Sequence, residues 1–116
     1  MHFKLIMAFV DDSKTKDIME AAREAGATGA TVIGDARGEG LRPKRTFFGL
    51  TMEAQRDMLL FLVEEHLSRK VLEHIAEVGG FDINPSQGVA LQLDVEDTIG
   101  LKKQIKTIME EVEDEL

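Results

Sequence analysis

The first third of the chain changes from a strand pattern to a helix pattern and back. Residues 2–10 place apolar side chains on both faces of a predicted strand, because successive strand side chains point to opposite faces. Polar residues 11–13 supply N-cap chemistry for a helix that Gly26 ends. The inward stripe of that helix is Ile18, Met19, Ala22 and Ala25. A second strand is predicted over residues 28–33, ending at Gly34.

The second half repeats strand and helix patterns after a long connection. Residues 57–63 are, after Asp57, continuously apolar, which predicts a strand covered on both faces. Glu64 and Glu65 open a helix that closes at Gly79 and Gly80. The turn-rich residues 81–88 follow, then a strand over 89–96 and a last helix over 101–116. In that strand Val89, Leu91, Leu93 and Val95 alternate with Ala90, Gln92, Asp94 and Glu96, so the second set is expected to meet water or a polar interface.

This order predicts an α+β fold of the ferredoxin-like type, βαββαβ, with a long loop between strands 2 and 3 and an extra C-terminal helix. We expect a single domain over residues 1–116, with the core in 1–96, the loop in 38–56 and the helix in 101–116. Both helices of the core cover one face of the sheet. The other face is apolar in the first and third strands, so we expect copies of the chain to bury it in a homo-oligomer.

The long connection carries a charge opposite to the rest of the chain. Residues 37–56 hold five Lys or Arg against two Glu, a local net charge of +3. The whole chain has a net charge of −8, so the other residues carry −8 − 3 = −11. A basic loop on an acidic body is suited to phosphates, carboxylates or an acidic partner surface. Long loops without periodicity are usually functional or disordered.

Composition excludes several classes of function. The overall acidity argues against nucleic-acid binding, which needs a broad basic face. The chain has no cysteine, so disulfides and thiolate chemistry are excluded. The N-terminus lacks signal-peptide features, and no apolar run approaches the ~20 residues of a membrane span, so a cytoplasmic protein is expected. No acid and base stand at catalytic spacing, and an enzyme is therefore not expected.

Short motifs, in this order and spacing, resemble the PII nitrogen-regulatory signal-transduction family from about Phe3 to Val95. Residues 26–32 (GATGATV) are similar to the family's second strand, residues 38–40 (GEG) to the start of its T-loop, and residues 64–67 (EEHL) to the start of its second helix. The resemblance implies a homotrimer that binds ATP or ADP in clefts between subunits. There the T-loop base meets a second loop, the B-loop, and the T-loop docks on a target such as a membrane transporter or an enzyme.

The resemblance also implies roles for single residues. Thr31 would face the adenine, Gly38 and Gly40 would line the phosphates, and Gly88 would close the B-loop. Several marks of the family are missing, however. Leu41 stands where the family has the glutamine used with magnesium and 2-oxoglutarate, Val89 where it has the phosphate-binding lysine, and no tyrosine is present for modification. Residues 96–98 (EDT) replace an arginine-rich strand end, so three cationic contacts are absent.

Two interpretations of the cleft stay open. Arg42, helped by Lys44 and Arg45, would bind ATP, ADP, AMP or another small anion, which we favour; otherwise the protein is an adaptor without nucleotide binding. Lys44, Arg45, Phe47 and Phe48 form a candidate partner-docking surface, although the two aromatic rings could equally pack on the sheet. A trimer of the divalent-cation-tolerance type is the other candidate, but the histidines do not cluster and no metal site is expected.

Overall fold

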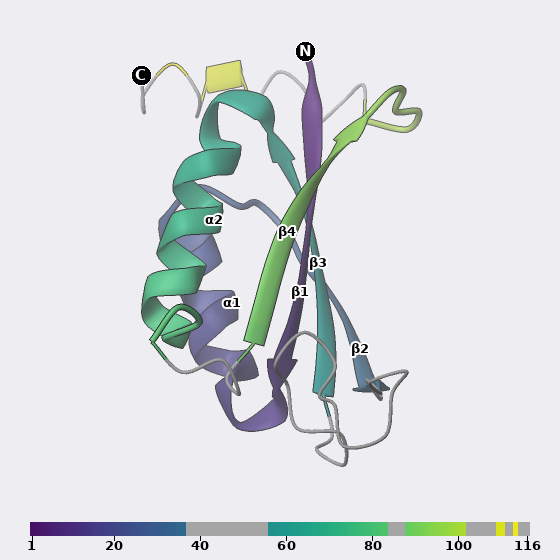
Figure 1. The fold of residues 1–116 in the computed structure, drawn as a ribbon. Helices are drawn as coiled ribbons and strands as arrows, with labels where there is room; N and C mark the ends of the chain where they lie inside the picture. The colour runs from purple at the N-terminus through teal and green to yellow at the C-terminus, as the bar shows by residue number, and fades with distance from the viewer. Residues whose placement is uncertain (37–55, 84–87, 102–108, 111–112, 114–116) are drawn as a thin grey trace.

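The computed structural model describes residues 1–36, 56–83, 88–101, 109–110 and 113. Its elements are β1 (Phe3–Asp11), a 3₁₀ turn (Asp12–Lys14), α1 (Thr15–Glu24), β2 (Thr31–Ala36), β3 (Arg56–Glu64), α2 (Glu65–Gly79) and β4 (Gly88–Val95). The four strands form one antiparallel sheet in the order β2-β3-β1-β4 (Figure 1). The predicted fold class is confirmed.

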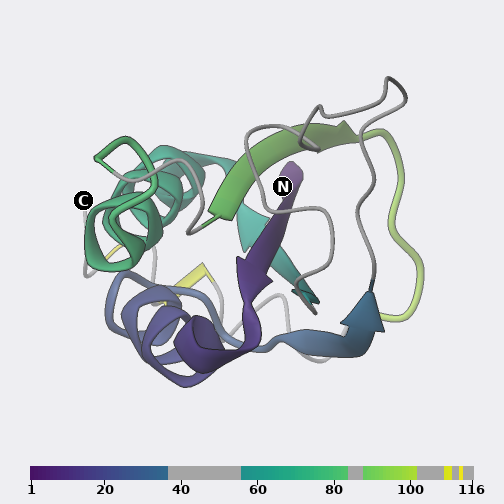
Figure 2. The ribbon, with the colours of Figure 1, turned by 60° about the horizontal axis from the view of Figure 1, so that its bottom comes forward.

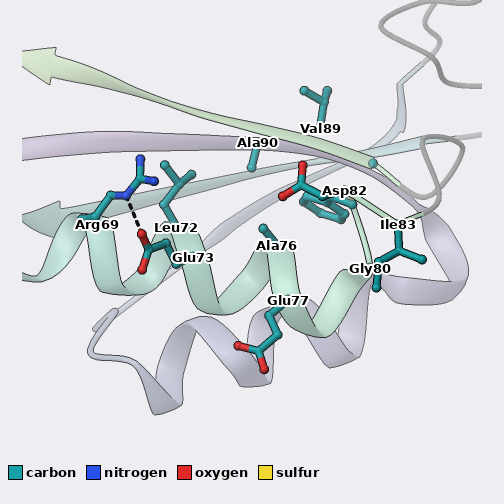
Figure 3. A pocket seen from close by; sticks show the side chains of 12 residues that line it. Arg69, Leu72, Glu73, Ala76, Glu77, Gly80, Asp82, Ile83, Val89 and Ala90 are labelled. Carbon is teal, nitrogen blue, oxygen red and sulfur yellow. Dashed lines mark hydrogen bonds and ion pairs between the residues drawn. The ribbon is translucent and has the colours of Figure 1, made fainter.

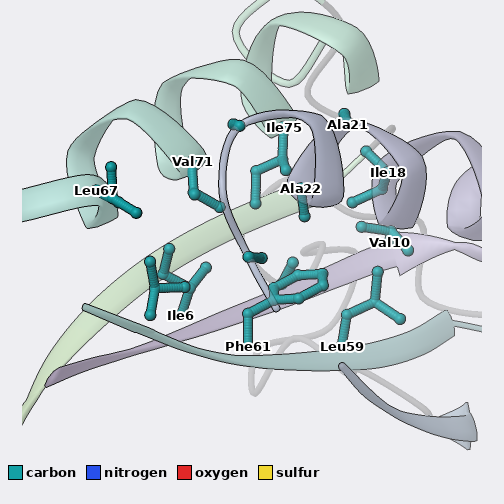
Figure 4. Close-up of a cluster of buried hydrophobic side chains, with 14 of the residues drawn as sticks. Ile6, Val10, Ile18, Ala21, Ala22, Leu59, Phe61, Leu67, Val71 and Ile75 are labelled. Carbon is teal, nitrogen blue, oxygen red and sulfur yellow. The ribbon is translucent and has the colours of Figure 1, made fainter. Parts of the chain in front are cut away.

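The two helices lie side by side on one face of the sheet (Figure 2). Between the layers is a core of fully buried side chains, labelled in Figure 4: Ile6 and Val10 from β1, Ile18 and Ala22 from α1, Leu59 and Phe61 from β3, and Val71 and Ile75 from α2. Full burial of such an aliphatic or aromatic side chain contributes roughly 1.5–3 kcal/mol. The alternate residues of β1 and β3 provide this core, as their sequence periods predict.

The face without helices is apolar along all four strands. Cross-strand partners share a face, and Met7 of β1 pairs with Leu60 of β3 and Leu91 of β4. The same face carries Leu5, Phe9, Ile33, Met58, Leu62, Val89 and Leu93. These side chains are half-buried or exposed. We call this set of ten side chains the open face.

β2 and α1 begin later than the sequence pattern predicts. β2 starts at Thr31 rather than 28 and continues past Gly34 to Ala36. It can do so because its pairing with β3 shifts register between Ile33 and Ala36, where Asp35 adopts a left-handed φ of 59°. α1 starts at Thr15, and the predicted cap residue Asp11 instead accepts a hydrogen bond from the Ser13 amide within the 3₁₀ turn. An added bulge and a tight turn are both invisible in a pattern of apolar positions.

One face of β4 differs from the expectation. Ala90 pairs with Ala8 and Gln92 pairs with Ile6, whose side chains face the helices. Ala90 therefore packs against the core, and the Gln92 Oε1 atom is buried without a hydrogen-bond partner in the described part of the chain. The prediction that this face of β4 meets water or a polar interface is wrong for these two residues. It holds for Asp94 and Glu96, which are exposed beyond the cover of α2.

α2 has the predicted boundaries because both of its ends are capped. Its N-cap, Glu64, accepts a hydrogen bond from the His66 amide. At its end Gly80 adopts a left-handed conformation, and the Phe81 amide donates to the Ala76 carbonyl, as in a Schellman motif. Of the predicted last helix, Met109, Glu110 and Glu113 are helical, Leu101 lies outside any helix, and residues 102–108 lie outside the described part.

Candidate functional site

The two ends of segment 37–55 and the start of β4 lie at one end of the sheet. Ala36 and Arg56 are cross-strand partners, Arg56 also pairs with Asp11, and the neighbouring Val10 pairs with Gly88 (Figure 1). The fold therefore brings the base of the basic loop and the end of the 81–88 connection to the same end of the sheet. Of the predicted site residues, the structure describes Thr31 and Gly88. The others lie outside the described part: Gly38, Gly40, Arg42, Lys44, Arg45, Phe47 and Phe48.

Thr31 lies at the opposite end of β2, in a cavity of about 320 Å³. Its lining residues are Phe3, Thr28, Gly29, Ala30, Thr31, Leu60, Leu62 and Leu101. Apart from two threonine hydroxyls the lining side chains are apolar, and none of them is charged. Small-molecule sites typically have volumes of ~300–1,000 Å³ and combine apolar walls with a few polar groups. The cavity suits a flat, weakly polar group such as a nucleobase.

Gly88 has a packing role in the structure. It is buried, and a Cβ atom added there would lie 2.6 Å from Cε1 of Phe81 and 2.9 Å from the carbonyl oxygen of Phe9. The first contact is with a ring and the second is with backbone, so a side chain does not fit without movement of the strand. Close packing against Phe81 and Phe9 therefore favours glycine at this position.

Thr31 and Gly88 are far apart within one chain. Thr31 pairs with Leu60, Leu60 with Met7, and Met7 with Leu91, which places Thr31 and β4 on opposite edges of the sheet. Three strand spacings give about 14 Å across the sheet, and three residues along β4 add about 10 Å. A single small ligand cannot contact both residues in one chain. A site that uses both requires a second copy.

Arg56 is a candidate residue that the sequence pattern does not single out. It is only 2% exposed, and its Nη1 atom lies 3.5 Å from Oδ2 of Asp11. Among the described residues, its Nε atom has no hydrogen-bond partner. A buried, unsatisfied donor costs about 1–3 kcal/mol, which makes this guanidinium a candidate anion contact at the loop base. The only sequence signal is a basic residue next to Asp57, just before the apolar residues 58–63.

Asp11 connects this arginine to the start of the helical layer. Its carboxylate accepts hydrogen bonds from the Ser13 hydroxyl at 2.7 Å and from the Ser13 amide at 3.0 Å. These bonds, and the nearby charge of Arg56, lower the pKa of Asp11 below its ordinary value, against the opposing effect of burial. The carboxylate is therefore held in its charged form between the loop base and α1.

A comparison with protein-family models identifies the family. The model described as "Nitrogen regulatory protein P-II" matches residues 3–105, which is most of the chain. The chain belongs to the P-II family. The resemblance inferred from the strand order and the short motifs is thus confirmed. No curated protein matches the P-II chain in sequence.

Solved structures of P-II-like proteins have the same fold. CPII from Thiomonas intermedia K12 bound to ADP, AMP and acetate is 19% identical, with a TM-score of 0.66 over 84% of this chain and 90% of that chain. CPII bound to ADP and bicarbonate is 21% identical, with a TM-score of 0.62 over 82% and 87%. A PII-like signaling protein from Thermus thermophilus is 26% identical, with a TM-score of 0.59 over 82% and 88%.

A second cluster of polar side chains in this P-II protein acts as a helix cap. Ligand-type atoms of Glu64, Glu65 and His66 lie within 4.8 Å of one another. However, the buried Glu64 carboxylate is already bound by the amide and by the Nδ1 atom of His66. His74 lies on the same helix and contacts Glu24 of α1 at 3.3 Å. The Glu64–His66 contacts thus cap α2, and the His74–Glu24 contact joins α2 to α1.

One further observation concerns membranes. Within the described ranges, α1 and α2 included, no helix has the length and the apolar character needed to cross a bilayer.

Proposed function

We propose that the chain is a regulatory protein that assembles as a homotrimer and binds a small effector in clefts between its subunits. The effector is an adenine nucleotide, ADP or AMP in preference to ATP, or another small anion. The basic loop 38–56 then docks a partner protein. The domain serves binding and signalling, and no catalytic role is assigned to it.

The open face supports self-association. About ten apolar side chains share it, with Met7 and Leu60 near its middle. Apolar surface removed from water contributes roughly 25 cal/mol per Å², and large exposed apolar patches mark interaction sites. Copies of the same chain are the natural occupants, since the family consists of oligomers. The same assembly would bring Thr31 of one copy toward Gly88 of another.

The Thr31 cavity supports a nucleobase site. Its apolar walls offer stacking and burial, and the two threonine hydroxyls offer hydrogen bonds. The phosphates would bind cations at the base of the loop. Arg56 lies there, and Arg42 belongs to the loop that follows Ala36 in the sequence. The structures of CPII were solved with ADP, AMP, acetate and bicarbonate, which are the kinds of ligand proposed here. The resemblance places residues 96–98 where the family has cationic phosphate contacts, and the acidic Glu96 and Asp97 at these positions would favour ADP or AMP over ATP.

The loop sequence supports partner docking. Lys44 and Arg45 supply positive charge, and Phe47 and Phe48 supply apolar anchors, on an otherwise acidic chain. Arginine and aromatic residues are common among the residues that dominate protein interfaces. An effector bound at the loop base can select one loop conformation, because it binds that conformation more tightly.

The observation that carries this proposal is the separation of Thr31 and Gly88 on opposite sheet edges, which a multimer resolves. The test combines light scattering with a thermal-shift series of AMP, ADP, ATP and bicarbonate. At 100 times its Kd, a ligand that binds only the folded state stabilises it by about 2.7 kcal/mol. We expect a trimer mass and a rise of several degrees with ADP or AMP.

Matched variants locate the site. Arg42→Ala should remove most of the nucleotide shift, whereas Arg23→Ala, which changes an exposed arginine of α1 paired with Glu20, should leave it intact. A monomer that no nucleotide or anion stabilises would contradict the proposal and favour an adaptor without an effector site.

A further inference from the structure

The segment that follows β4, residues 96–101, crosses the sheet from one edge toward the other. β4 and β2 are the outer strands, and yet Leu101 lines the Thr31 cavity together with residues 28–31. Figure 2 shows the segment running from the end of β4 toward β2. Extended over its length it can span about 20 Å, whereas three strand spacings amount to about 14 Å. We call residues 96–101 the crossing segment.

The crossing segment treats its two apolar residues differently. Ile99 is 99% exposed, whereas Leu101 is half-buried and lines the cavity. Gly100 lies between them with a left-handed φ of 101°, a conformation that residues with a side chain rarely adopt. The turn at Gly100 therefore lets Leu101 lie against the cavity while Ile99 faces water.

Leu101 is also the lining residue that comes from outside the sheet and its neighbouring segment 28–31. The other apolar side chains of the cavity are Phe3 of β1 with Leu60 and Leu62 of β3, besides Ala30. Phe3 is two residues before Leu5 in β1 and therefore points to the same side as the open face. Phe3 is only 3% exposed, however, whereas Leu5 is half-buried. This end of the sheet thus has an apolar cover within the chain, and Leu101 belongs to it.

A larger groove of about 730 Å³ lies between α2 and β4 (Figure 3). Its lining includes three acids, Glu73, Glu77 and Asp82, and the cation Arg69, which donates a hydrogen bond to Glu73. A flat, uncharged group gains little from charged walls, and ligand pockets are mostly apolar with a few polar groups. The uncharged Thr31 cavity therefore suits a nucleobase better than this groove does.

We infer that Leu101 determines the specificity of the proposed effector site, because it packs on a nucleobase bound in the Thr31 cavity. The inference rests on the proposed function and narrows its ligand to a nucleotide that carries a base. An apolar side chain stabilises a base by removing the flat surface of the base from water, and it offers no such gain to a phosphate or a carboxylate. Removal of Leu101 should therefore weaken only the ligands that carry a base.

The test compares AMP with ribose 5-phosphate, which has the same sugar and phosphate and no base. NMR titration of the full-length protein measures both Kd values, including millimolar ones. We expect the parent to bind AMP at least about 100-fold more tightly than ribose 5-phosphate. Leu101→Ala should weaken AMP binding about tenfold and change ribose 5-phosphate binding less than about twofold.

Three further variants separate the contact from general damage to the protein. Leu101→Met keeps an apolar side chain of similar volume, so its Kd for AMP should stay within about threefold of the parent. Gly100→Ala adds a Cβ that meets nothing within 4 Å, but it strains the left-handed turn and should weaken AMP binding about threefold or more. Ile99→Ala is the control on the same segment and should change the Kd for AMP less than about twofold.

Equal affinity of the parent and Leu101→Ala for AMP would overturn the inference and leave the proposed function intact. The same holds if the parent binds ribose 5-phosphate as tightly as AMP, since the effector site would then recognise an anion without a base. A change in subunit number in Leu101→Ala, measured by light scattering, would also overturn the inference, because the residue would then act through assembly. A parent that binds neither AMP nor bicarbonate would contradict the effector site itself, and the inference with it.

Discussion

At the scale of single residues, the base of the basic loop depends on one buried arginine and one carboxylate. Arg56 is buried where the loop enters β3, and Asp11 faces it from the end of β1. Because Asp11 also holds the Ser13 amide and hydroxyl, it connects the loop base with the turn that precedes α1. An uncharged side chain at position 11 would remove the ion-pair partner that the described residues give to the buried Arg56 guanidinium.

The lowered pKa of Asp11 predicts a pH dependence of stability. A carboxyl whose folded pKa lies below its unfolded value of about 3.9 contributes stability above that pH and loses it as pH falls through the folded pKa. Asp11→Asn should therefore lower the unfolding free energy at pH 7, and its stability should fall less than that of the parent below about pH 4. Urea unfolding at pH 7 and at pH 3 measures both effects.

The control for this prediction is Asp97→Asn, which changes an exposed carboxylate after β4. It should shift stability little at either pH. If the unfolding free energies of the parent and of Asp11→Asn fell in parallel at acid pH, the carboxylate at position 11 would not contribute to stability.

At the scale of elements, the Phe81 ring packs between the end of α2 and the start of β4. Phe81 packs over Gly88, and a Cβ at Gly79 would lie 2.4 Å from the same ring. The helix can thus end next to the start of the strand only because both contacting positions lack side chains. This packing holds the end of α2 next to the start of β4.

Gly88→Ala should destabilise the protein by about 1–3 kcal/mol, because the new methyl group meets both the Phe81 ring and the Phe9 carbonyl. Thermal or urea unfolding measures the loss. Gly29→Ala is the matched control, since nothing lies within 4 Å of its added Cβ. Equal stabilities of the two variants would mean that the strand relaxes around position 88.

At the scale of the whole molecule, the sheet has one face covered by helices and one apolar face without them. The helix-covered face accounts for the buried core, and the open face has no comparable cover from α1 or α2. A charged side chain placed in the middle of the open face would be removed from water in any assembly that buries it. Such burial of an unpaired charge is strongly unfavourable.

Met7→Glu should therefore convert the expected trimer to monomers, as measured by sedimentation velocity or light scattering. Circular dichroism should still report a folded chain, because Met7 faces away from the helical layer. Val78→Glu is the control, since this exposed apolar residue lies on α2. A parent and a Met7→Glu variant of equal mass would refute self-association through the open face.

The sequence by itself determined the order of strands and helices along the chain, the two layers and the apolar open face. These follow from local periods and caps: alternation in residues 2–10, the helical stripe ending at Gly79, and the left-handed Gly80. The family resemblance was also readable, because it rests on short motifs around Thr31 and Glu64 in a given order. Such signals depend on neighbours within about one turn or one strand.

The tertiary structure alone decided which distant residues meet. Arg56 and Asp11, 45 positions apart, become cross-strand partners, and Ala90 and Gln92 turn toward the helices because of the partners they pair with on β1. It also placed Thr31 and Gly88 on opposite edges of the sheet. The register of the strands and their order within the sheet arise from pairing between segments far apart in the chain. A local pattern holds no information on that pairing.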